Sequence, residues 1–284
     1  YEISACLVGS EMCIRDRFAI SNIGKKETGK HPAIVGLAEV ENAKAIEDLI
    51  ASKHLEAINY GYVHYDSLDE RGIDVALLYD SDAFEVEHSE SFRVHLTRDT
   101  GETDYTRDIL LVSGLLDGEQ IHVIANHWSS RREGAKETEH KRFAAADKVI
   151  EIINDLNIKY SNPKIVVIGD FNDDPTSNSI KRMVDSLGLF NPMEVLHTYS
   201  RGTTTYNYQW NLFDQILFST NFFEATPDTL SFDKAYENKL KIMDMTAFTL
   251  CKENNIPVVV FDMNIPGNLK KVILGNKVGT LVTV

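Results

Sequence analysis

The residues with the clearest chemical potential are a carboxylate and a carboxamide that follow a short apolar run. Ile165–Ile168 lies between a proline and a glycine, which predicts a strand buried on both faces. Asp170 and Asn172 appear where the chain leaves that strand. Held at a rigid strand end, these side chains can address a hard cation, a water nucleophile and a phosphoryl oxygen. The alternative is a solvated loop that only begins the helix after Ser177.

Two further apolar runs end in polar residues. Ala33–Val40 carries Glu39 near its end, and Gln120–Asn126 leads directly into His127. Glu39 needs a partner or solvent, because burying an unpaired carboxylate costs several kcal/mol. His127 can exchange a proton with a phosphate oxygen near neutral pH. Its alternative is a packed, hydrogen-bonded histidine beside Trp128.

A buried acid and two arginines complete the set of candidate residues. Asp214 lies within the apolar run Leu212–Phe218, so we expect a histidine, lysine or arginine beside it. Arg107 precedes a predicted strand and Arg131 belongs to a basic cluster after His127; each could bind a substrate phosphate. A salt bridge at the rim is an equal alternative for Arg107. The strand-end residues and Asp214 together predict a metal-assisted phosphoester site.

Length and composition place these residues in an α/β protein. The 284 residues, 43% hydrophobic and 25% charged, can bury the core of one large domain, or of one domain plus a fragment. No apolar run approaches the ~20 residues that a membrane span needs. The formal net charge of -14 opposes broad attachment to nucleic acid, although a local basic patch beside a metal could still hold a phosphate backbone. The three cysteines show neither a disulfide framework nor zinc spacing.

Strands and helices must position the candidate residues. Turn residues between apolar runs predict two antiparallel pairs, and apolar residues at helical spacing predict three helices. The pairs are 72–79 with 84–88 and 108–114 with 120–126; the helices follow Asn42, run through 143–156 and lie near 179–187.

Four segments resemble motifs of the endonuclease/exonuclease/phosphatase superfamily, in family order over about residues 18 to 236: Leu37-Ala-Glu39-Val, Asn126-His127-Trp-Ser-Ser-Arg131, Gly169-Asp170-Phe-Asn172 and Phe213-Asp214-Gln-Ile-Leu-Phe-Ser219. The resemblance implies a four-layer sandwich, with two packed mixed sheets flanked by helices, truncated here at both ends. It also implies a nuclease or phosphodiesterase that uses Mg2+ or Mn2+.

The same resemblance assigns a role to each residue of the site. Glu39 would ligate the metal, and Asp170 would position or deprotonate the attacking water. Asn172 and His127 would stabilise the phosphoryl group in the transition state, while Asp214 would orient a further histidine. We expect a monomer that acts on a phosphoester, with nucleic acid among the candidate substrates.

Parts of the family pattern are missing. The family closes with a Ser-Asp-His strand, but no histidine follows His197 in this sequence. The place of an early strand with an asparagine is taken by Tyr1–Arg17, which resembles a translated sequencing adapter and has no signal-peptide layout. We therefore expect an artefactual leader at 1–17, an incomplete domain at 18–236 and an impaired hydrolase. The alternative is a catalytically inactive chimeric remnant.

Residues 237–284 resemble the C-terminal end of bacterial uridylate kinase. The pattern predicts a helix at 244–254, a buried parallel strand at 258–261, a short helix after Asn268 and a last strand. One of these strands could pair with a sheet edge left open by the missing family strands. The segment has no glycine-rich phosphate loop, so a nucleotide-binding function is not expected from it.

Overall fold

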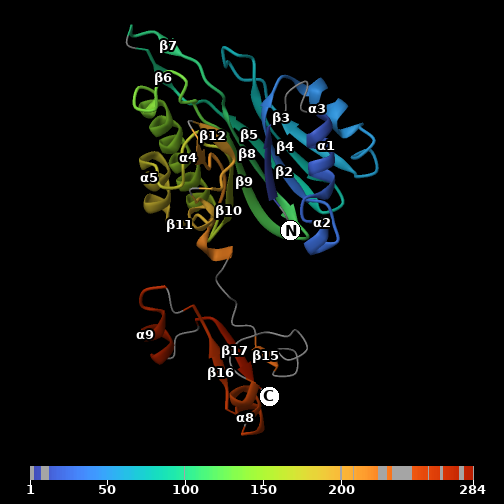
Figure 1. Ribbon diagram of the computed structural model, residues 1–284, viewed down its shortest axis with the longest axis vertical. Helices are drawn as coiled ribbons and strands as arrows, with labels where there is room; N and C mark the ends of the chain where they lie inside the picture. Colours follow the sequence, from blue (N-terminus) through green and yellow to red (C-terminus); the bar gives the residue numbers. More distant parts are fainter. Residues whose placement is uncertain are drawn as a thin grey trace. The chain divides into compact units, whose positions relative to one another are not determined.

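The computed structural model describes residues 3–7, 13–98, 100–198, 200–206, 208–222, 229–231, 245–254, 256–262, 265–274 and 278–283 (Figure 1). The chain forms two compact units, Tyr1–Ser219 and Thr220–Val284. This division comes before the domain boundary expected at residue 236, which itself lies outside the described residues.

Two sheets form the framework of the first unit (Figure 1). The four-stranded sheet has the order β1 (Ile3–Leu7), β2 (Ile34–Val40), β4 (Asp74–Asp80) and β3 (Tyr60–His64). The six-stranded sheet has the order β11 (Leu189–Phe190), β14 (Asp214–Ser219), β10 (Lys164–Asp170), β9 (Glu119–His127), β8 (Ile109–Leu116) and β5 (Phe84–Phe92). Two short hairpins are β6 (Leu96–Thr97) with β7 (Thr103–Asp104), and β12 (Thr204–Tyr206) with β13 (Gln209–Asn211). The predicted pair of 108–114 with 120–126 is confirmed as β8 and β9, but the predicted pair of 72–79 with 84–88 is wrong, because β4 and β5 lie in different sheets and β5 pairs with β8.

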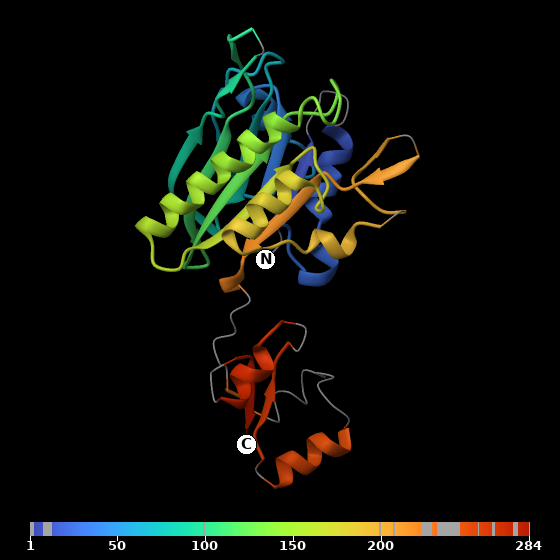
Figure 2. The same ribbon diagram turned by 90° about the vertical axis from the view of Figure 1, so that its left-hand side faces the viewer.

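Helices cover the outer faces of the two sheets (Figures 1 and 2). One side carries α1 (Cys13–Asn22), α2 (Lys25–Thr28) and α3 (Ala43–Ile50), and the other carries α4 (Glu139–Lys159) and α5 (Asn178–Leu187). The short helices α6 (Met193–Leu196) and η1 (Thr220–Phe222) lie in connections. The layers are therefore helix, sheet, sheet and helix, and the expected α/β sandwich is confirmed.

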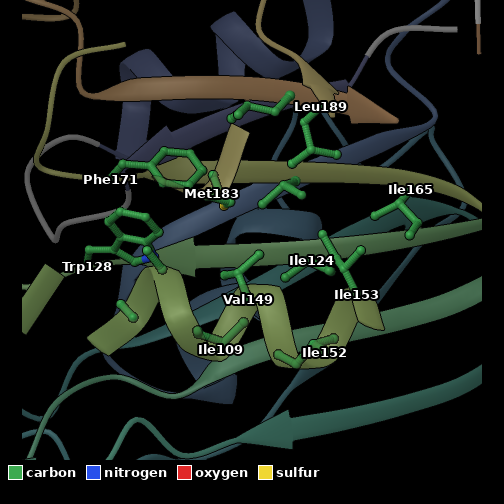
Figure 3. Close-up of a cluster of buried hydrophobic side chains, with 14 of the residues drawn as sticks. Ile109, Ile124, Trp128, Val149, Ile152, Ile153, Ile165, Phe171, Met183 and Leu189 are labelled. Carbon is green, nitrogen blue, oxygen red and sulfur yellow. The ribbon is translucent and has the colours of Figure 1, made fainter. Parts of the chain in front are cut away.

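Apolar side chains fill the space between each sheet and its helices. Beneath α4 and α5, Val149 and Met183 pack with Ile124 and Ile165 of the six-stranded sheet (Figure 3). Burying one such side chain contributes about 1.5–3 kcal/mol. A second cluster joins α3 to the four-stranded sheet. These two cores fix the positions of the strand ends that carry polar residues.

The segment expected to be a leader outside the fold contributes to it. Ile3–Leu7 pairs in parallel with β2 at the edge of the four-stranded sheet, and α1 begins at Cys13. Ladder hydrogen bonds come from the backbone, so a short segment without clean periodicity can still add a strand to an edge. The origin of this segment stays a prediction.

The second unit contains, among its described residues, three strands, two α-helices and the short 3-10 helix η1. The strand order is β15 (Thr229–Ser231), β17 (Thr280–Thr283) and β16 (Val258–Val260), and the helices are α8 (Met245–Glu253) and α9 (Asn268–Ile273). The sequence predicts α8, β16, α9 and β17 but not β15, and it wrongly predicts β16 as a buried parallel strand. It is partly exposed and pairs antiparallel with β17. The described strands of this unit pair with one another.

Within the described residues, no helix combines the length and the apolar character that crossing a membrane requires.

Candidate active site

A cleft of about 720 Å³ lies at the ends of central strands from both sheets. Glu39 near the end of β2, His127 at the end of β9 and Asp170 at the end of β10 all line it. Asn172, two residues after β10, lines the same cleft. Strands β9 and β10 run in parallel with His127 directly beside Asp170, which explains why these residues meet. The four strand-end residues thus converge in one place.

Glu39 occupies an irregular point in its strand. Its φ is 57°, and the register between β2 and β4 shifts between Leu37 and Val40. Bulges of this kind re-aim side chains and recur beside active sites. The Glu39 Oε1 atom accepts a hydrogen bond from Arg71 Nη2 at 3.1 Å, and 36% of its side chain stays exposed. Arg71 is thus the partner that the sequence requires, and the carboxylate remains accessible.

Asp170 has an unusual electrostatic environment. Burial and the nearby charge of Asp214 raise the pKa of Asp170 to about 7, with a smaller contribution from Glu39. The Asn172 backbone N–H donates to Asp170 Oδ1 at 2.8 Å, and this bond opposes the increase in pKa. A carboxylate with a pKa near 7 can accept a proton from water at neutral pH, as a general base must.

His127 is buried and neutral. Burial lowers its pKa well below the usual value, and the positive charges of Arg107 and Arg71 lower it further. Its Nε2 atom lies 3.8 Å from Asp170 Oδ2, and its Nδ1 atom is buried without a hydrogen-bond partner in the described part of the chain. A buried polar atom of this kind is usually satisfied by water or a bound species. A neutral imidazole can donate one hydrogen bond and accept another.

Asn172 is held by its neighbours in a left-handed conformation with φ 47°. Its side-chain Nδ2 donates to the Trp128 carbonyl oxygen at 2.9 Å, and its own backbone carbonyl accepts from Arg131 Nε at 2.7 Å. The structure shows no donor to the Asn172 side-chain oxygen within the described residues. That oxygen is therefore available to water, metal or substrate.

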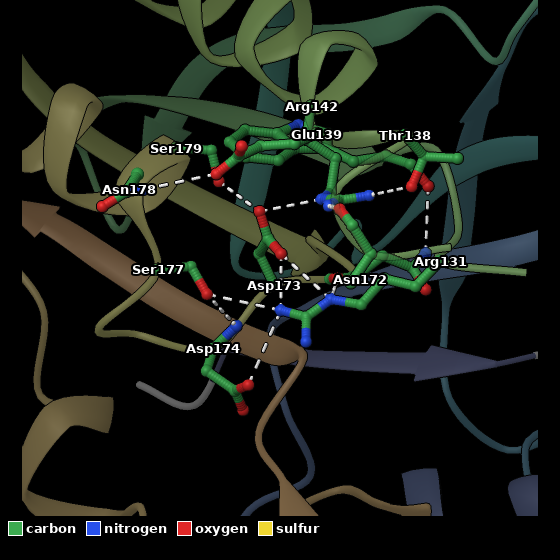
Figure 4. A network of polar contacts seen from close by, with 12 residues as sticks. Arg131, Thr138, Glu139, Arg142, Asn172, Asp173, Asp174, Ser177, Asn178 and Ser179 are labelled. Atoms are coloured by element: carbon green, nitrogen blue, oxygen red, sulfur yellow. Dashed lines mark hydrogen bonds and ion pairs between the residues drawn. The ribbon is translucent and has the colours of Figure 1, made fainter. Parts of the chain in front are cut away.

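A polar network beyond Asn172 fixes the loop after β10 (Figure 4). The buried Asp173 carboxylate accepts a hydrogen bond from Arg131 Nε at 3.0 Å and another from the Ser179 hydroxyl. Arg142 Nε lies 2.8 Å from Asp173 Oδ2, an ion pair without hydrogen-bond geometry. Arg131 also lines the cleft, but its guanidinium is engaged with Asp173 and lies over the Phe213 ring. Its binding to substrate stays a prediction.

Arg107 is buried rather than placed at the rim. Its Nη1 atom pairs with Asp69 Oδ2 at 3.0 Å, and its Nε donates to the His127 carbonyl oxygen at 3.2 Å. Its Nη2 donates to the Trp128 carbonyl oxygen. These contacts fix the end of β9, and Arg107 lines a neighbouring cleft instead of the one with Asp170. Its predicted contact with substrate stays a prediction.

Asp214 lacks the basic partner that the sequence leads us to expect. It lies opposite Asp170 in the ladder between β10 and β14. Burial raises the pKa of Asp214, while a hydrogen bond with Thr203 opposes that increase. No basic side chain pairs with Asp214 among the described residues. The negative charge of Asp214 contributes to the raised pKa of Asp170.

The donor atoms in the cleft suit a hard divalent cation. Carboxylate oxygens of Glu39 and Asp170 and the carboxamide oxygen of Asn172 are ligands that Mg2+ and Mn2+ prefer. A cation would also relieve the crowding of negative charge that raises the pKa of Asp170. The cleft therefore suits a divalent cation for two reasons, its oxygen ligands and the crowding of negative charge around Asp170.

A separate group of possible ligands lies on neighbouring strands. Ligand atoms of His64, Asp66 and Asp74 are within 4.8 Å of one another. Asp74 already contacts His64 Nε2 at 3.2 Å and accepts a hydrogen bond from the Ser67 N–H at 2.9 Å. These contacts account for both carboxylate oxygens of Asp74 without a metal.

Several residues that line the cleft could not be identified from the sequence. Arg71 belongs to none of the motifs, but its exposed guanidinium pairs with Glu39 and lines the cleft. The β12–β13 hairpin adds Thr204, Thr205 and Asn211. Its residues show no pattern that would place them there, because tertiary contacts position this loop. Arg132 also lines the cleft, and the basic cluster after His127 is the sequence signal for it.

The model of the Endonuclease/Exonuclease/phosphatase family matches residues 17–247. The chain belongs to this family. Two solved structures show the family fold. A Bacteroides thetaiotaomicron mannosyl-6-phosphatase has a TM-score of 0.54 at 19% identity, covering 76% of this chain and 84% of that one. D. rerio TDP2 complexed with a single-strand DNA product has a TM-score of 0.52 at 15% identity, covering 76% and 82%.

The second resemblance is also confirmed. A uridylate kinase of Parabacteroides distasonis is 57% identical over 53 residues, which is 19% of this chain and 22% of the kinase. The chain thus spans about a fifth of the length of the uridylate kinases that it matches.

Proposed function

We propose that this chain is a metal-dependent phosphoester hydrolase of the nuclease or phosphodiesterase type. Asp170 orients the attacking water and accepts its proton. The observation that supports this most strongly is the convergence of Glu39, His127, Asp170 and Asn172 in one cleft. Without a metal, the pKa of about 7 for Asp170 fits a general base at neutral pH. A bound cation would lower that pKa and, at the same time, the pKa of the attacking water.

The other cleft residues have complementary roles in this proposal. Glu39, with the oxygens of Asp170 and Asn172, holds Mg2+ or Mn2+, which would polarise the phosphoryl oxygens. Neutral His127 donates a hydrogen bond to a phosphoryl oxygen, and the Asn172 amide helps to orient the same group. Such preorganised donors stabilise charge that develops in the transition state.

Asp214 points to a weakened enzyme. The family resemblance gives this acid a histidine to orient, and no histidine follows His197 in the sequence. Losing one preorganised donor lowers the rate ~100 to 1000-fold in other enzymes. We therefore expect slow turnover, with the remaining cleft residues supplying the rate.

The fold neighbours support phosphoester chemistry without choosing a substrate. One is a mannosyl-6-phosphatase and another holds a single-strand DNA product. The same sandwich thus serves a sugar phosphate and a nucleic acid, and fold alone does not decide between them.

A hydrolysis panel with and without Mg2+ tests the proposal. Bis-p-nitrophenyl phosphate, a hexose phosphate, an inositol phosphate and single-stranded DNA represent the substrate classes. We expect slow, Mg2+-dependent hydrolysis of at least one, lost in Asp170→Ala. Asp155→Asn is a matched control, because Asp155 is exposed on α4 and outside the cleft. Activity that survives Asp170→Ala would overturn the mechanism, and inertness towards every substrate would favour the inactive remnant.

A further inference from the structure

A second cleft, of about 520 Å³, adjoins the candidate active site. Arg71, Ser130 and Arg132 line both clefts, so the two spaces meet at these residues. The β6–β7 hairpin forms one wall, and the loop between β9 and α4 forms another. A substrate whose phosphate lies beside Asp170 would therefore extend into this second cleft.

The charges of the second cleft are balanced in number, and most of its basic side chains are paired with acids. Its lining holds five acidic and five basic side chains, apart from one histidine: Asp69, Glu70, Asp104, Glu133 and Glu137 against Arg71, Arg98, Arg107, Arg132 and Lys141. Asp104, for example, lies 2.8 Å from Lys141 Nζ and 3.3 Å from Arg98 Nε. Because four of these five bases already have acidic partners, and only Arg132 has none among the described residues, the wall offers little net positive charge to a second phosphate.

A nucleic-acid strand needs a different surface. Single-strand grooves combine a basic track for the backbone with aromatic platforms for the bases. Here the bases other than Arg132 are paired, and Tyr105 is the aromatic residue in the described lining. The formal net charge of -14 also opposes a polyanion.

Polar groups in the wall match the hydroxyls of a sugar. Thr97, Tyr105 and Ser130 carry hydroxyls, each of which can donate and accept, and exposed carboxylates such as Glu137 accept. A polyol presents many groups that both donate and accept. The wall is therefore complementary to an uncharged, polyhydroxylated molecule.

Arg132 marks the boundary between the two clefts. It is exposed, and the structure gives it no ion pair with any described residue. An unpaired guanidinium is well suited to bind a phosphate. Arg132 lies at the junction of the two clefts, where it would contact the phosphate of a substrate that spans both.

We propose that the second cleft binds the sugar or polyol part of the substrate, with Arg132 holding the phosphate at the junction. The inference rests on the proposed function, because the candidate active site must receive that phosphate. It narrows the substrate to a compact sugar or polyol phosphoester and disfavours a nucleic-acid strand.

Binding measurements test this subsite independently of turnover. The full chain is titrated by calorimetry, in Mg2+, with a hexose 6-phosphate, inorganic phosphate and an oligodeoxythymidylate. Asp170→Asn is used so that the ligands stay intact. We expect the hexose phosphate to bind about tenfold more tightly than inorganic phosphate, equivalent to about 1.4 kcal/mol of added contacts. The oligonucleotide should gain nothing over inorganic phosphate.

Two variants separate the subsite from the phosphate site. Thr97→Trp places a bulky ring in the second cleft and should remove the tenfold gain while leaving the affinity for inorganic phosphate unchanged. Thr100→Trp, in the same hairpin but outside the lining, is its matched control. Arg132→Gln should weaken both phosphate ligands alike. A Thr97→Trp protein with an unchanged preference for hexose phosphate would overturn the subsite.

Titration with the oligonucleotide gives the result that could contradict the proposal. Tight binding that falls steeply with salt would show several phosphate contacts and overturn the proposal. Failure of the proposed function looks different. If hexose phosphate binding depends on Thr97 in a chain that hydrolyses nothing, the subsite stands and the enzymatic proposal falls. If hydrolysis requires Asp170 but ignores Thr97→Trp for every substrate, the enzymatic proposal stands and the subsite falls.

Discussion

The two compact units bury their apolar side chains to different extents. In the first unit, Ile124 and Val167 are fully buried between the six-stranded sheet and its helices. In the second unit, Leu250 and Ile273 expose 57% and 74% of their surface. The packed layers of the first unit therefore bury apolar surface that the described helices of the second unit leave exposed.

The difference shows what a catalytic cleft requires from its fold. Polar groups such as Asp170 and Asp173 can be held in a buried position only where packed layers fix the backbone around them. The first unit has these layers, and all the candidate active-site residues lie in it. In the second unit, the described strands are short, and the described helix residues Leu250, Leu269 and Ile273 are exposed.

The largest effect on stability should come from the network that anchors the active-site loop. Asp173→Ala leaves the buried Arg142 guanidinium, 1% exposed, without its carboxylate. Breaking a buried ion pair costs about 3–5 kcal/mol. Urea unfolding measures this loss, with Asp174→Ala as a control closer to solvent. A change of less than about 1 kcal/mol, the range of exposed ion pairs, would show that the network is not anchoring the loop.

Core truncations compare the two units directly. Ile124→Ala should cost about 2–5 kcal/mol, because it opens a cavity in a packed core. Ile273→Ala should change stability by less than about 0.5 kcal/mol, since that side chain already meets water. Equal costs for the two variants would contradict the contrast between the units.

The charge on Asp170 should make the first unit less stable as pH rises. The folded pKa of about 7 lies above the unfolded value of about 3.9, so the folded state binds the proton more tightly. Stability should therefore fall between about pH 4 and pH 7 and then level off. Asp170→Asn removes this loss and should stabilise the protein by about 1–3 kcal/mol at pH 8 but little at pH 4.

Urea unfolding in EDTA measures this pH dependence, with Asp155→Asn as the exposed control. Added Mg2+ should narrow the gap between Asp170→Asn and wild type, because a cation offsets the carboxylate charge. A gap that stays constant from pH 4 to pH 8 would mean that Asp170 is not electrostatically strained.

The smallest effect should come from deleting residues 237–284, which make up most of the second unit. The described strands of each unit pair within that unit, so deleting residues 237–284 should leave the main unfolding transition in place. A clear drop in the midpoint would show instead that the tail covers an edge of the first unit, as the sequence alone suggests it could.

The strand ends of the site could be predicted from the sequence for a physical reason. Apolar runs such as Ile165–Ile168 are local signals, and parallel strands deliver their carboxyl ends to one edge. The motifs around Glu39 and Asp170 occur along the chain in the same order as in the family. These features predicted the sandwich and the convergence of the four cleft residues.

Other features depend on tertiary contacts that no local pattern encodes. The left-handed bulge at Glu39 and its pairing with Arg71 arise from the fit between β2 and β4. Thr205 reaches the cleft because the β12–β13 hairpin folds over it. For Asp214 the sequence predicts a basic partner that the described residues do not provide. A buried acid can do without a base, because burial can raise its pKa instead.

The most direct test compares a substitution in the cleft of the first unit with a deletion in the second unit, in the same assay. Mg2+-dependent phosphoester hydrolysis is measured for wild type, Asp170→Ala and the chain lacking residues 237–284. We expect Asp170→Ala to lower the rate at least ~100-fold, as loss of a principal catalytic group does, and the deletion to leave it unchanged. Activity that persists without the Asp170 carboxylate, or that disappears with the second unit, would contradict the assignment of catalysis to the cleft of the first unit.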